Sequence, residues 1–149
     1  MPVYLSNATR NTGLDFPALE RTTEVLLAAL DERGSSVSLS FVRDPAIREL
    51  NRMHRGKDVP TDVLSFPLVE EGDAYAGAER LLGDVVISVD TARRQAADYD
   101  APLAREVERL LIHGLLHLLG HDHLEPGERA EMESEERRLA DVIGMPWPY

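Results

Sequence analysis

The stretch "HGLLHLLGHDH", residues 113–123, contains four of the five histidines in this 149-residue chain. His113 and His117 are four residues apart, so on a helix they would lie one turn apart on the same face. The leucines around them make the stretch apolar on nearly every side, which is typical of a buried helix. Imidazoles on a buried helix need polar partners, and a metal ion between the two rings would be one.

The end of this helix determines which histidine can be a third ligand. If the helix continued past Gly120, His121 would lie about 12 Å along the axis from His113, too far for one ion with zinc–nitrogen bonds of about 2.0–2.1 Å. Glycine commonly ends helices in the left-handed conformation, so the chain is expected to turn at Gly120. We therefore predict one zinc ion per chain, with His121 partly exposed in the turn and the ligands His113, His117 and His123.

The spacing of the three histidines also limits the reactions that the site could catalyse. Three neutral histidine ligands leave one coordination position open, as in catalytic zinc sites, where the pKa of a bound water falls to about 7. Metzincin proteases share the spacing, but they carry a glutamate base directly after the first histidine, where this chain has Gly114. A metallopeptidase is therefore less favoured, and a non-catalytic zinc protein remains an alternative. Asp122 either hydrogen-bonds a ligating imidazole or is an exposed residue of the turn.

The composition is that of a globular chain of about one domain, with 43% hydrophobic and 29% charged residues. There is no cysteine, so a metal must be held by His, Asp or Glu. No apolar stretch approaches the roughly 20 residues that span a bilayer, and the first ten residues do not resemble a secretion signal. The net charge of −11 argues against a polyanionic partner, yet residues 48–57, "RELNRMHRGK", contain four bases and one acid. Nucleic acid therefore stays compatible with the sequence.

Hydrophobic periodicity places strands early in the chain and helices later, which predicts the α+β class. The run 62–66, between two prolines, is expected at a sheet edge, and the β-branched run 84–89 in the interior. The remaining strands are expected at 3–7 and 37–42. Helices are expected after an N-cap at Asp15, from Asp44 to Met53, after an N-cap at Asp90, from Pro102 through the histidines, and from Pro126 to Ile143.

Three blocks of the sequence resemble signatures of one family. "HGLLHLLGHDH" is similar to the pattern H-G-x-L-H-L-x-G-Y-D-H of the YbeY family. "LNRMHRGKDVPTDVLSFP" at 50–67 resembles a second signature of that family, and "GDVVIS" at 83–88 a third. The chain departs from the family pattern at His121, where tyrosine is usual, and at His54, a frequently aromatic position.

The resemblance implies a single metal-dependent endoribonuclease domain over residues 1–149. It implies a small mixed sheet of about four strands packed with helices, with the metal site on a long buried helix and the turn after it. It further implies cleavage of single-stranded RNA in 16S rRNA 3′-end maturation and ribosome quality control. The expected setting is the cytoplasm, without membrane attachment, and the expected partners are an rRNA precursor, the small ribosomal subunit and assembly factors. The family's zinc ligands fall on His113, His117 and His123, and its functional arginine falls on Arg55.

The role implied for Arg55 also has a physical basis. Phosphodiester cleavage places negative charge on the phosphoryl oxygens, and a guanidinium matches phosphate with a planar fork of donors. We predict that Arg55 is catalytic and steadies the scissile phosphate, with Arg48, Arg52 and Lys57 binding the RNA backbone. Arg48 and Arg52, four residues apart, could equally form a solvated helix face.

Two further segments carry weaker expectations. In "PTDVLSFP", Ser65 and Asp62 are candidate substrate contacts, in what is otherwise an ordinary edge strand. On the last helix, Met132 is expected to pack in the core. The acidic run "EMESEERR" at 131–138 is expected to form a solvated face.

Overall fold

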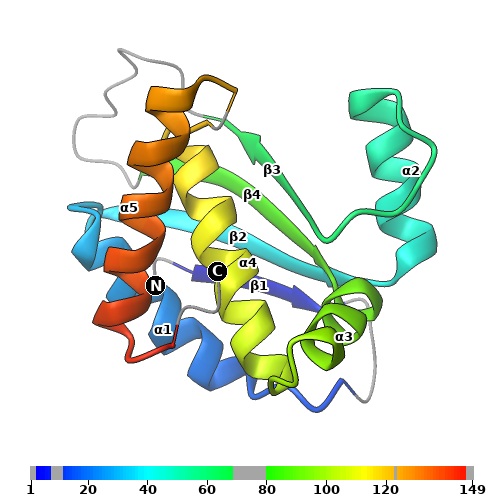
Figure 1. Cartoon of the computed structure of the whole chain (residues 1–149), viewed down its shortest axis with the longest axis horizontal. Helices are drawn as coiled ribbons and strands as arrows, with labels where there is room; N and C mark the ends of the chain where they lie inside the picture. Colours follow the sequence, from blue (N-terminus) through cyan, green and yellow to red (C-terminus); the bar gives the residue numbers. More distant parts are fainter. Residues whose placement is uncertain (1–2, 8–11, 69–79, 123, 147–149) are drawn as a thin grey trace.

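The computed structural model describes residues 3–7, 12–68, 80–122 and 124–146. Within these ranges the chain forms four strands and five helices (Figure 1). In chain order the elements are β1 (Val3–Asn7), α1 (Phe16–Ala29), β2 (Ser35–Val42), α2 (Asp44–Arg55), β3 (Val63–Pro67), β4 (Arg80–Ser88), α3 (Val89–Asp98), α4 (Leu103–Leu118) and α5 (Pro126–Val142). None of the described helices is both long and apolar enough to cross a bilayer.

The four strands form one mixed sheet in the order β1-β2-β4-β3. β1, β2 and β4 are parallel, whereas β3 runs antiparallel to β4, with Val63 opposite Ile87. β3 is therefore an edge strand that ends at Pro67, where a missing N–H is tolerated, and the β-branched β4 lies in the interior. The predicted α+β class, the mixed sheet of about four strands and the positions of these two strands are confirmed.

Helices cover both faces of the sheet because β4 is apolar on both faces. Val85 and Ile87 point into the main core, where α4 packs across β3 and β4, with α1 and α5 beside it (Figure 1). Val86 points to the opposite face and packs with Leu64 of β3 and Ile47 of α2 in a second cluster. α4 thus lies between the sheet and α5, which confirms the predicted long buried helix.

The start of α3 differs from the prediction. Asp90 was expected to cap this helix, but Ser88 is the N-cap, and its hydroxyl accepts a hydrogen bond from the Thr91 N–H at 3.2 Å. The prediction was wrong because β4 runs directly into α3, so the last strand residue is also the cap. Asp90 lies in the first turn and accepts hydrogen bonds from the Arg43 side chain at 2.8 Å and from the Asp44 N–H at 3.0 Å.

Asp44 and Asp90 together fasten the start of α2 to α3. The Asp44 carboxylate accepts hydrogen bonds from the Ser88 and Thr91 hydroxyls at 2.6 and 2.7 Å and from Arg94 at 2.8 Å. Partial burial raises the pKa of Asp44, but these hydrogen bonds outweigh it and leave the pKa below its ordinary value. The hydrogen bond from the Asp44 N–H likewise holds the pKa of Asp90 below its ordinary value.

We expect Asp90→Asn to destabilise the protein at neutral pH and to lose that effect in acid. Because the pKa of Asp90 is lower in the folded chain than its unfolded value of about 3.9, the carboxylate stabilises the fold above that pH. The contribution disappears as pH falls through the folded pKa. Urea unfolding of both proteins should show a difference in unfolding free energy that shrinks between about pH 5 and pH 3. A difference that stays constant over this range would contradict the assignment.

Candidate metal centre

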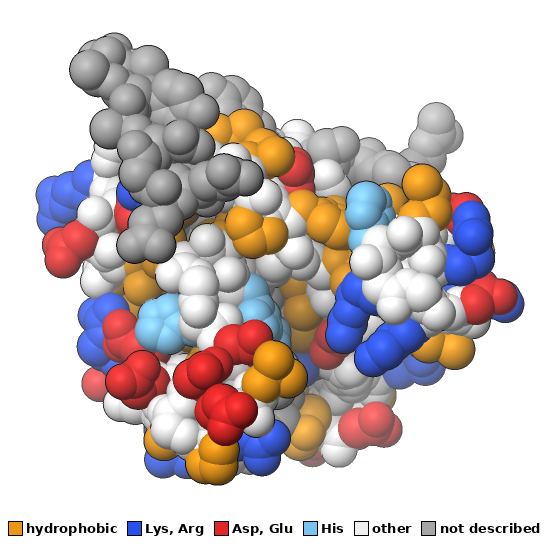
Figure 2. Space-filling model, turned by 90° about the horizontal axis from the view of Figure 1, so that it is seen from above, with side chains coloured by type: hydrophobic (Ala, Val, Ile, Leu, Met, Phe, Trp, Pro, Cys, Tyr) orange, Lys and Arg blue, Asp and Glu red, His pale blue; other side chains and the backbone are white. Residues whose placement is uncertain are grey.

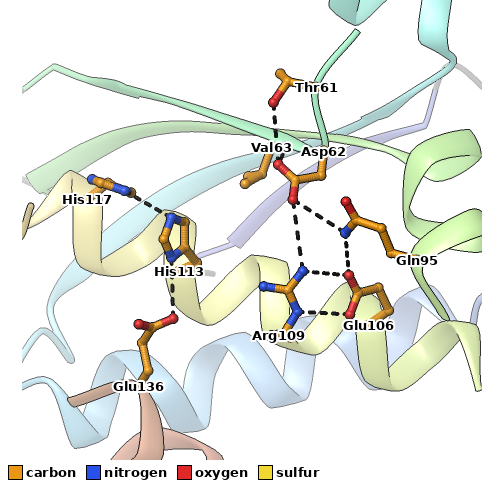
Figure 3. Close-up of polar contacts among 9 residues, drawn as sticks. All are labelled: Thr61, Asp62, Val63, Gln95, Glu106, Arg109, His113, His117 and Glu136. Carbon is orange, nitrogen blue, oxygen red and sulfur yellow. Dashed lines mark hydrogen bonds and ion pairs between the residues drawn. The ribbon is translucent and has the colours of Figure 1, made fainter. Parts of the chain in front are cut away.

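α4 brings His113 and His117 together on one face, as their spacing predicted. Their Nε2 atoms lie 3.0 Å apart, and the ring centroids lie 4.6 Å apart with the planes inclined at 77° (Figure 3). Both side chains are half-buried. The two nitrogens that could donate a lone pair to one cation therefore already face each other.

This pair fits the donor set of a zinc ion. With zinc–nitrogen bonds of about 2.0–2.1 Å, tetrahedral geometry places two ligand nitrogens about 3.3 Å apart, close to the distance between the two Nε2 atoms. Neutral imidazole is also a preferred ligand of this metal. The described residues contain no group of three His, Cys, Asp or Glu side chains that could hold an ion. His123, the predicted third ligand, lies outside the described residues, so the three-histidine set stays a prediction.

The turn after α4 has the form that the glycine predicted. Gly120 has a φ of +93°, in the left-handed region. Its N–H donates to the His117 carbonyl, and the His121 N–H donates to the Leu116 carbonyl, both at 3.0 Å, which is the Schellman pattern of a helix end. His121 and Asp122 are half-buried in this turn and line a cavity of about 230 Å³ against α5. The predicted position of His121 is confirmed, and the contact of Asp122 with a ligand stays a prediction.

Gly114 lies where α4 packs tightly against the sheet. A Cβ at this position would lie 2.7 Å from Val85 Cγ1 and 3.2 Å from Ser65 Oγ. The Ser65 hydroxyl also donates to the Gly114 carbonyl at 3.0 Å and so connects β3 to α4. This position has no room for the glutamate that a metzincin carries. Ser65 has a structural contact here, and its predicted contact with substrate stays a prediction.

A buried carboxylate that the sequence analysis missed contacts the histidine pair. Glu136 of α5 is 8% exposed, and its Oε2 lies 3.3 Å from His113 Nδ1 (Figure 3). The acidic run 131–138 was expected to form a solvated face, which is wrong for Glu136. The signal was the helical period, because Glu136 shares a buried stripe with Met132 and Leu139. Met132 is buried in the core, as predicted.

A second polar cluster joins α4 to α3 and to the start of β3. Arg109, one turn before His113, donates to buried Glu106 at 2.9 and 2.6 Å (Figure 3). Gln95 of α3 donates to both Glu106 and Asp62, and the Arg109 guanidinium lies 3.9 Å from Asp62. Asp62 also accepts from the Val63 N–H at 2.8 Å. These contacts fix the start of β3 beside the histidine helix.

The four predicted RNA-binding cations lie on α2 or just after its end, but in different environments. Arg48 forms a two-point ion pair with Asp58, at 2.9 and 3.3 Å, and this pair holds the pKa of the Asp58 carboxyl below its ordinary value. Arg52 pairs with Glu49 on its own helix. Arg55 is the last residue of α2 and is exposed, as is Lys57 after the turn.

Figure 2 shows how these elements face one another. Histidine side chains lie on two sides of a recess floored by hydrophobic side chains (Figure 2). On the side of α2, Lys and Arg side chains border the recess, whereas Asp and Glu side chains gather beside the histidines of the opposite wall. The arrangement places positive charge across the recess from the histidines of the opposite wall.

The fold and this site define an α+β domain with a histidine pair on one helix, suited to hold a metal, and a basic end on another helix. Residues 5–144 match the sequence model of the family described as Endoribonuclease YbeY. The Endoribonuclease YbeY of Moorella thermoacetica is 46% identical over 148 residues, which cover 91% of this chain and 95% of the relative. That of Aquifex aeolicus is 49% identical over 125 residues, which cover 84% and 79%. The chain therefore belongs to the YbeY family of endoribonucleases, which confirms the resemblance.

A solved structure agrees with this assignment. The solution structure of a Thermotoga maritima protein superposes with a TM-score of 0.67 at 28% sequence identity, covering 95% of this chain and 89% of that protein. The likeness therefore extends over nearly the whole fold.

Proposed function

We propose that this protein is a zinc-dependent endoribonuclease that cuts single-stranded RNA during 16S rRNA 3′-end maturation and ribosome quality control. The observation that carries the proposal is the pair of Nε2 atoms 3.0 Å apart on α4. The Lys and Arg side chains that border the recess on the side of α2 add a surface suited to RNA. The relatives named Endoribonuclease YbeY support the reaction class. The proposed setting is the cytoplasm, with the small ribosomal subunit and its assembly factors as partners.

His113, His117 and His123 would hold the metal, one ion per chain. A bound zinc ion supplies Lewis-acid chemistry, either by polarising a phosphoryl oxygen or by making water nucleophilic at neutral pH. The chain's own residues bind and orient the RNA. Arg55, exposed at the end of α2, offers a planar fork of donors to the scissile phosphate. Lys57 adds a positive charge for the neighbouring backbone, whereas carboxylates already neutralise Arg48 and Arg52 in part.

The metal is tested by removing it and adding it back. We expect the zinc-loaded protein to cut a single-stranded RNA carrying the 16S 3′-end sequence, to spare the same sequence in a duplex, and to lose activity after chelation. Added zinc should restore cleavage. Full activity in metal-free protein would overturn the proposal. Hydrolysis of casein instead of RNA would favour a metallopeptidase, and tight zinc binding without any cleavage would favour a non-catalytic zinc protein.

We expect Arg55→Ala to reduce kcat/KM for RNA cleavage by about a hundredfold, comparable to the loss of one donor to a developing oxyanion. Arg55→Lys should recover only part of this, because an ammonium lacks the two-point geometry. Arg48→Ala is the matched control, and its effect should stay below about tenfold because Asp58 already occupies that guanidinium. Zinc content must be equal in all variants. Wild-type cleavage by Arg55→Ala would remove Arg55 from the mechanism.

A further inference from the structure

Glu136 is placed where a carboxylate needs a partner. It is 8% exposed on α5, on the same buried stripe as Met132, Leu139 and Ala140, which are each 1% exposed or less. An ionised carboxylate at such a position is costly to bury unless it is hydrogen-bonded. A purely structural helix face would carry an apolar side chain here. The position therefore calls for a role that only a polar group can perform.

The described contact of this carboxylate is with one of the two predicted ligands on α4. Glu136 Oε2 lies 3.3 Å from His113 Nδ1, near the long end of the range for a hydrogen bond. On the far side of the same ring, His113 Nε2 lies 3.0 Å from His117 Nε2. Contacts thus connect Glu136 to His113 and His113 to His117 (Figure 3).

We propose that Glu136 is a positioning residue that selects the tautomer of His113. An ionised carboxylate can only accept a hydrogen bond, so the proton of a neutral His113 ring must be on Nδ1. Nε2 is then left with a lone pair, aimed at the point between the two imidazoles where a cation would bind. Carboxylates that hold ligating histidines in this way also fix the ring orientation and raise the basicity of the ligand. The inference rests on the proposed function for its metal but not for its tautomer.

α5 provides a matched control. Glu133 and Glu136 both line a cavity of about 280 Å³ next to His113, together with Arg129 and Met132. Glu133 is exposed, whereas Glu136 is buried against the imidazole. Replacing Glu133 removes the same charge from the same cavity without removing the contact with Nδ1.

The first measurement is zinc affinity, by competition with a chelator of known affinity. Glu136→Gln should weaken zinc binding about tenfold, since an amide accepts the same hydrogen bond without charge, and Glu136→Leu by up to about a hundredfold. Glu133→Gln should bind like wild type. Leucine suits a buried position, so Glu136→Leu should unfold at the same urea concentration as wild type or a higher one. If Glu136→Leu does not fold, Glu136→Gln alone decides. Wild-type zinc affinity in Glu136→Gln, and in Glu136→Leu where it folds, would overturn the proposal.

The second measurement needs no metal. In metal-free protein at a pH where histidine is neutral, long-range ¹⁵N–¹H spectra should show the Nδ1–H tautomer for His113 in wild type and in Glu133→Gln. In Glu136→Leu, or in Glu136→Ala if the leucine variant does not fold, no acceptor remains for Nδ1–H and the Nε2–H form should appear. An unchanged tautomer would overturn the proposal even if zinc affinity fell. If wild-type protein bound no zinc but the tautomer of His113 still changed in the Glu136 variant, the proposed metal would be overturned and the role of Glu136 supported.

Discussion

Replacing His117 by alanine is expected to abolish zinc binding at the centre and to reduce RNA cleavage by about a thousandfold or more. The substitution removes one of the two Nε2 atoms that lie 3.0 Å apart, so α4 retains a single imidazole. Loss of a metal's Lewis-acid role amounts to several kcal/mol of transition-state stabilisation, and each ~1.4 kcal/mol is tenfold in rate. The fold should persist, because alanine is the best helix former and His117 is only half-buried.

His121→Ala is the control for His117→Ala. It removes an imidazole from the same eleven-residue stretch, but from the turn after α4, where the backbone N–H rather than the ring completes the helix end. Metal analysis should find one zinc per chain in His121→Ala and wild type, and none in His117→Ala. The three proteins should have equal unfolding midpoints once zinc has been removed. Zinc retained by His117→Ala, or lost equally by His121→Ala, would show that the pair on α4 is not the metal centre.

The features that the sequence predicted correctly depend on the spacing and type of neighbouring residues. The four-residue spacing of His113 and His117 determines that they share a helix face, whatever packs against that face. Gly120 ends α4 because a positive φ is a property of the residue and its own turn. The β-branched run of β4 and the prolines around β3 likewise placed an interior and an edge strand. None of these inferences requires knowledge of a distant contact.

The features that were missed depend on contacts between elements. Glu136 lies 23 residues from His113 in the chain, and its acidic neighbours made the run look solvated. The helical period that it shares with Met132 and Leu139 separates it from exposed Glu133, but only the packing of α5 on α4 brings it to His113. Arg48 belongs to a basic stretch by composition, yet Asp58 across the following turn pairs with it. A count of charges predicts a basic surface but not which cations are already neutralised.

Gly114→Glu is the second substitution with a large expected effect. It would give the chain the order of residues that metzincins have, with glutamate directly after the first histidine. It should nevertheless yield no peptidase, because the protein should not fold. The new Cβ would lie 2.7 Å from Val85 Cγ1, and β4 is fixed on both sides by its neighbouring strands. Overpacking a core commonly costs about 1–3 kcal/mol, and a buried unpaired carboxylate adds several more. Together these approach the whole stability of a typical domain, about 5–15 kcal/mol.

Gly114→Ala isolates the steric part of this effect. Alanine should gain about 1 kcal/mol of helix propensity over glycine but lose more to the clash, so urea unfolding should show net destabilisation. Gly127→Ala is the matched control: it lies in the first turn of α5, where an added Cβ would meet nothing within 4 Å, and it should be neutral or stabilising. If both alanine variants were equally stable, the close approach of α4 to the sheet would not be what requires glycine at position 114.

A double-mutant cycle of Gly114→Ala with Val85→Ala tests the cause directly. Val85→Ala alone should destabilise the core by leaving a cavity, but it also removes the methyl group that a Cβ at position 114 would contact. The two substitutions together should therefore cost less than the sum of their separate effects, by about 1 kcal/mol or more. Additive costs would mean that the strain lies elsewhere, for example in the hydrogen bond from Ser65 to the Gly114 carbonyl. A combined cost below the sum would show that the sheet beneath α4 constrains position 114, next to His113. A hydrolase built on this helix would then need its proton acceptor on another element.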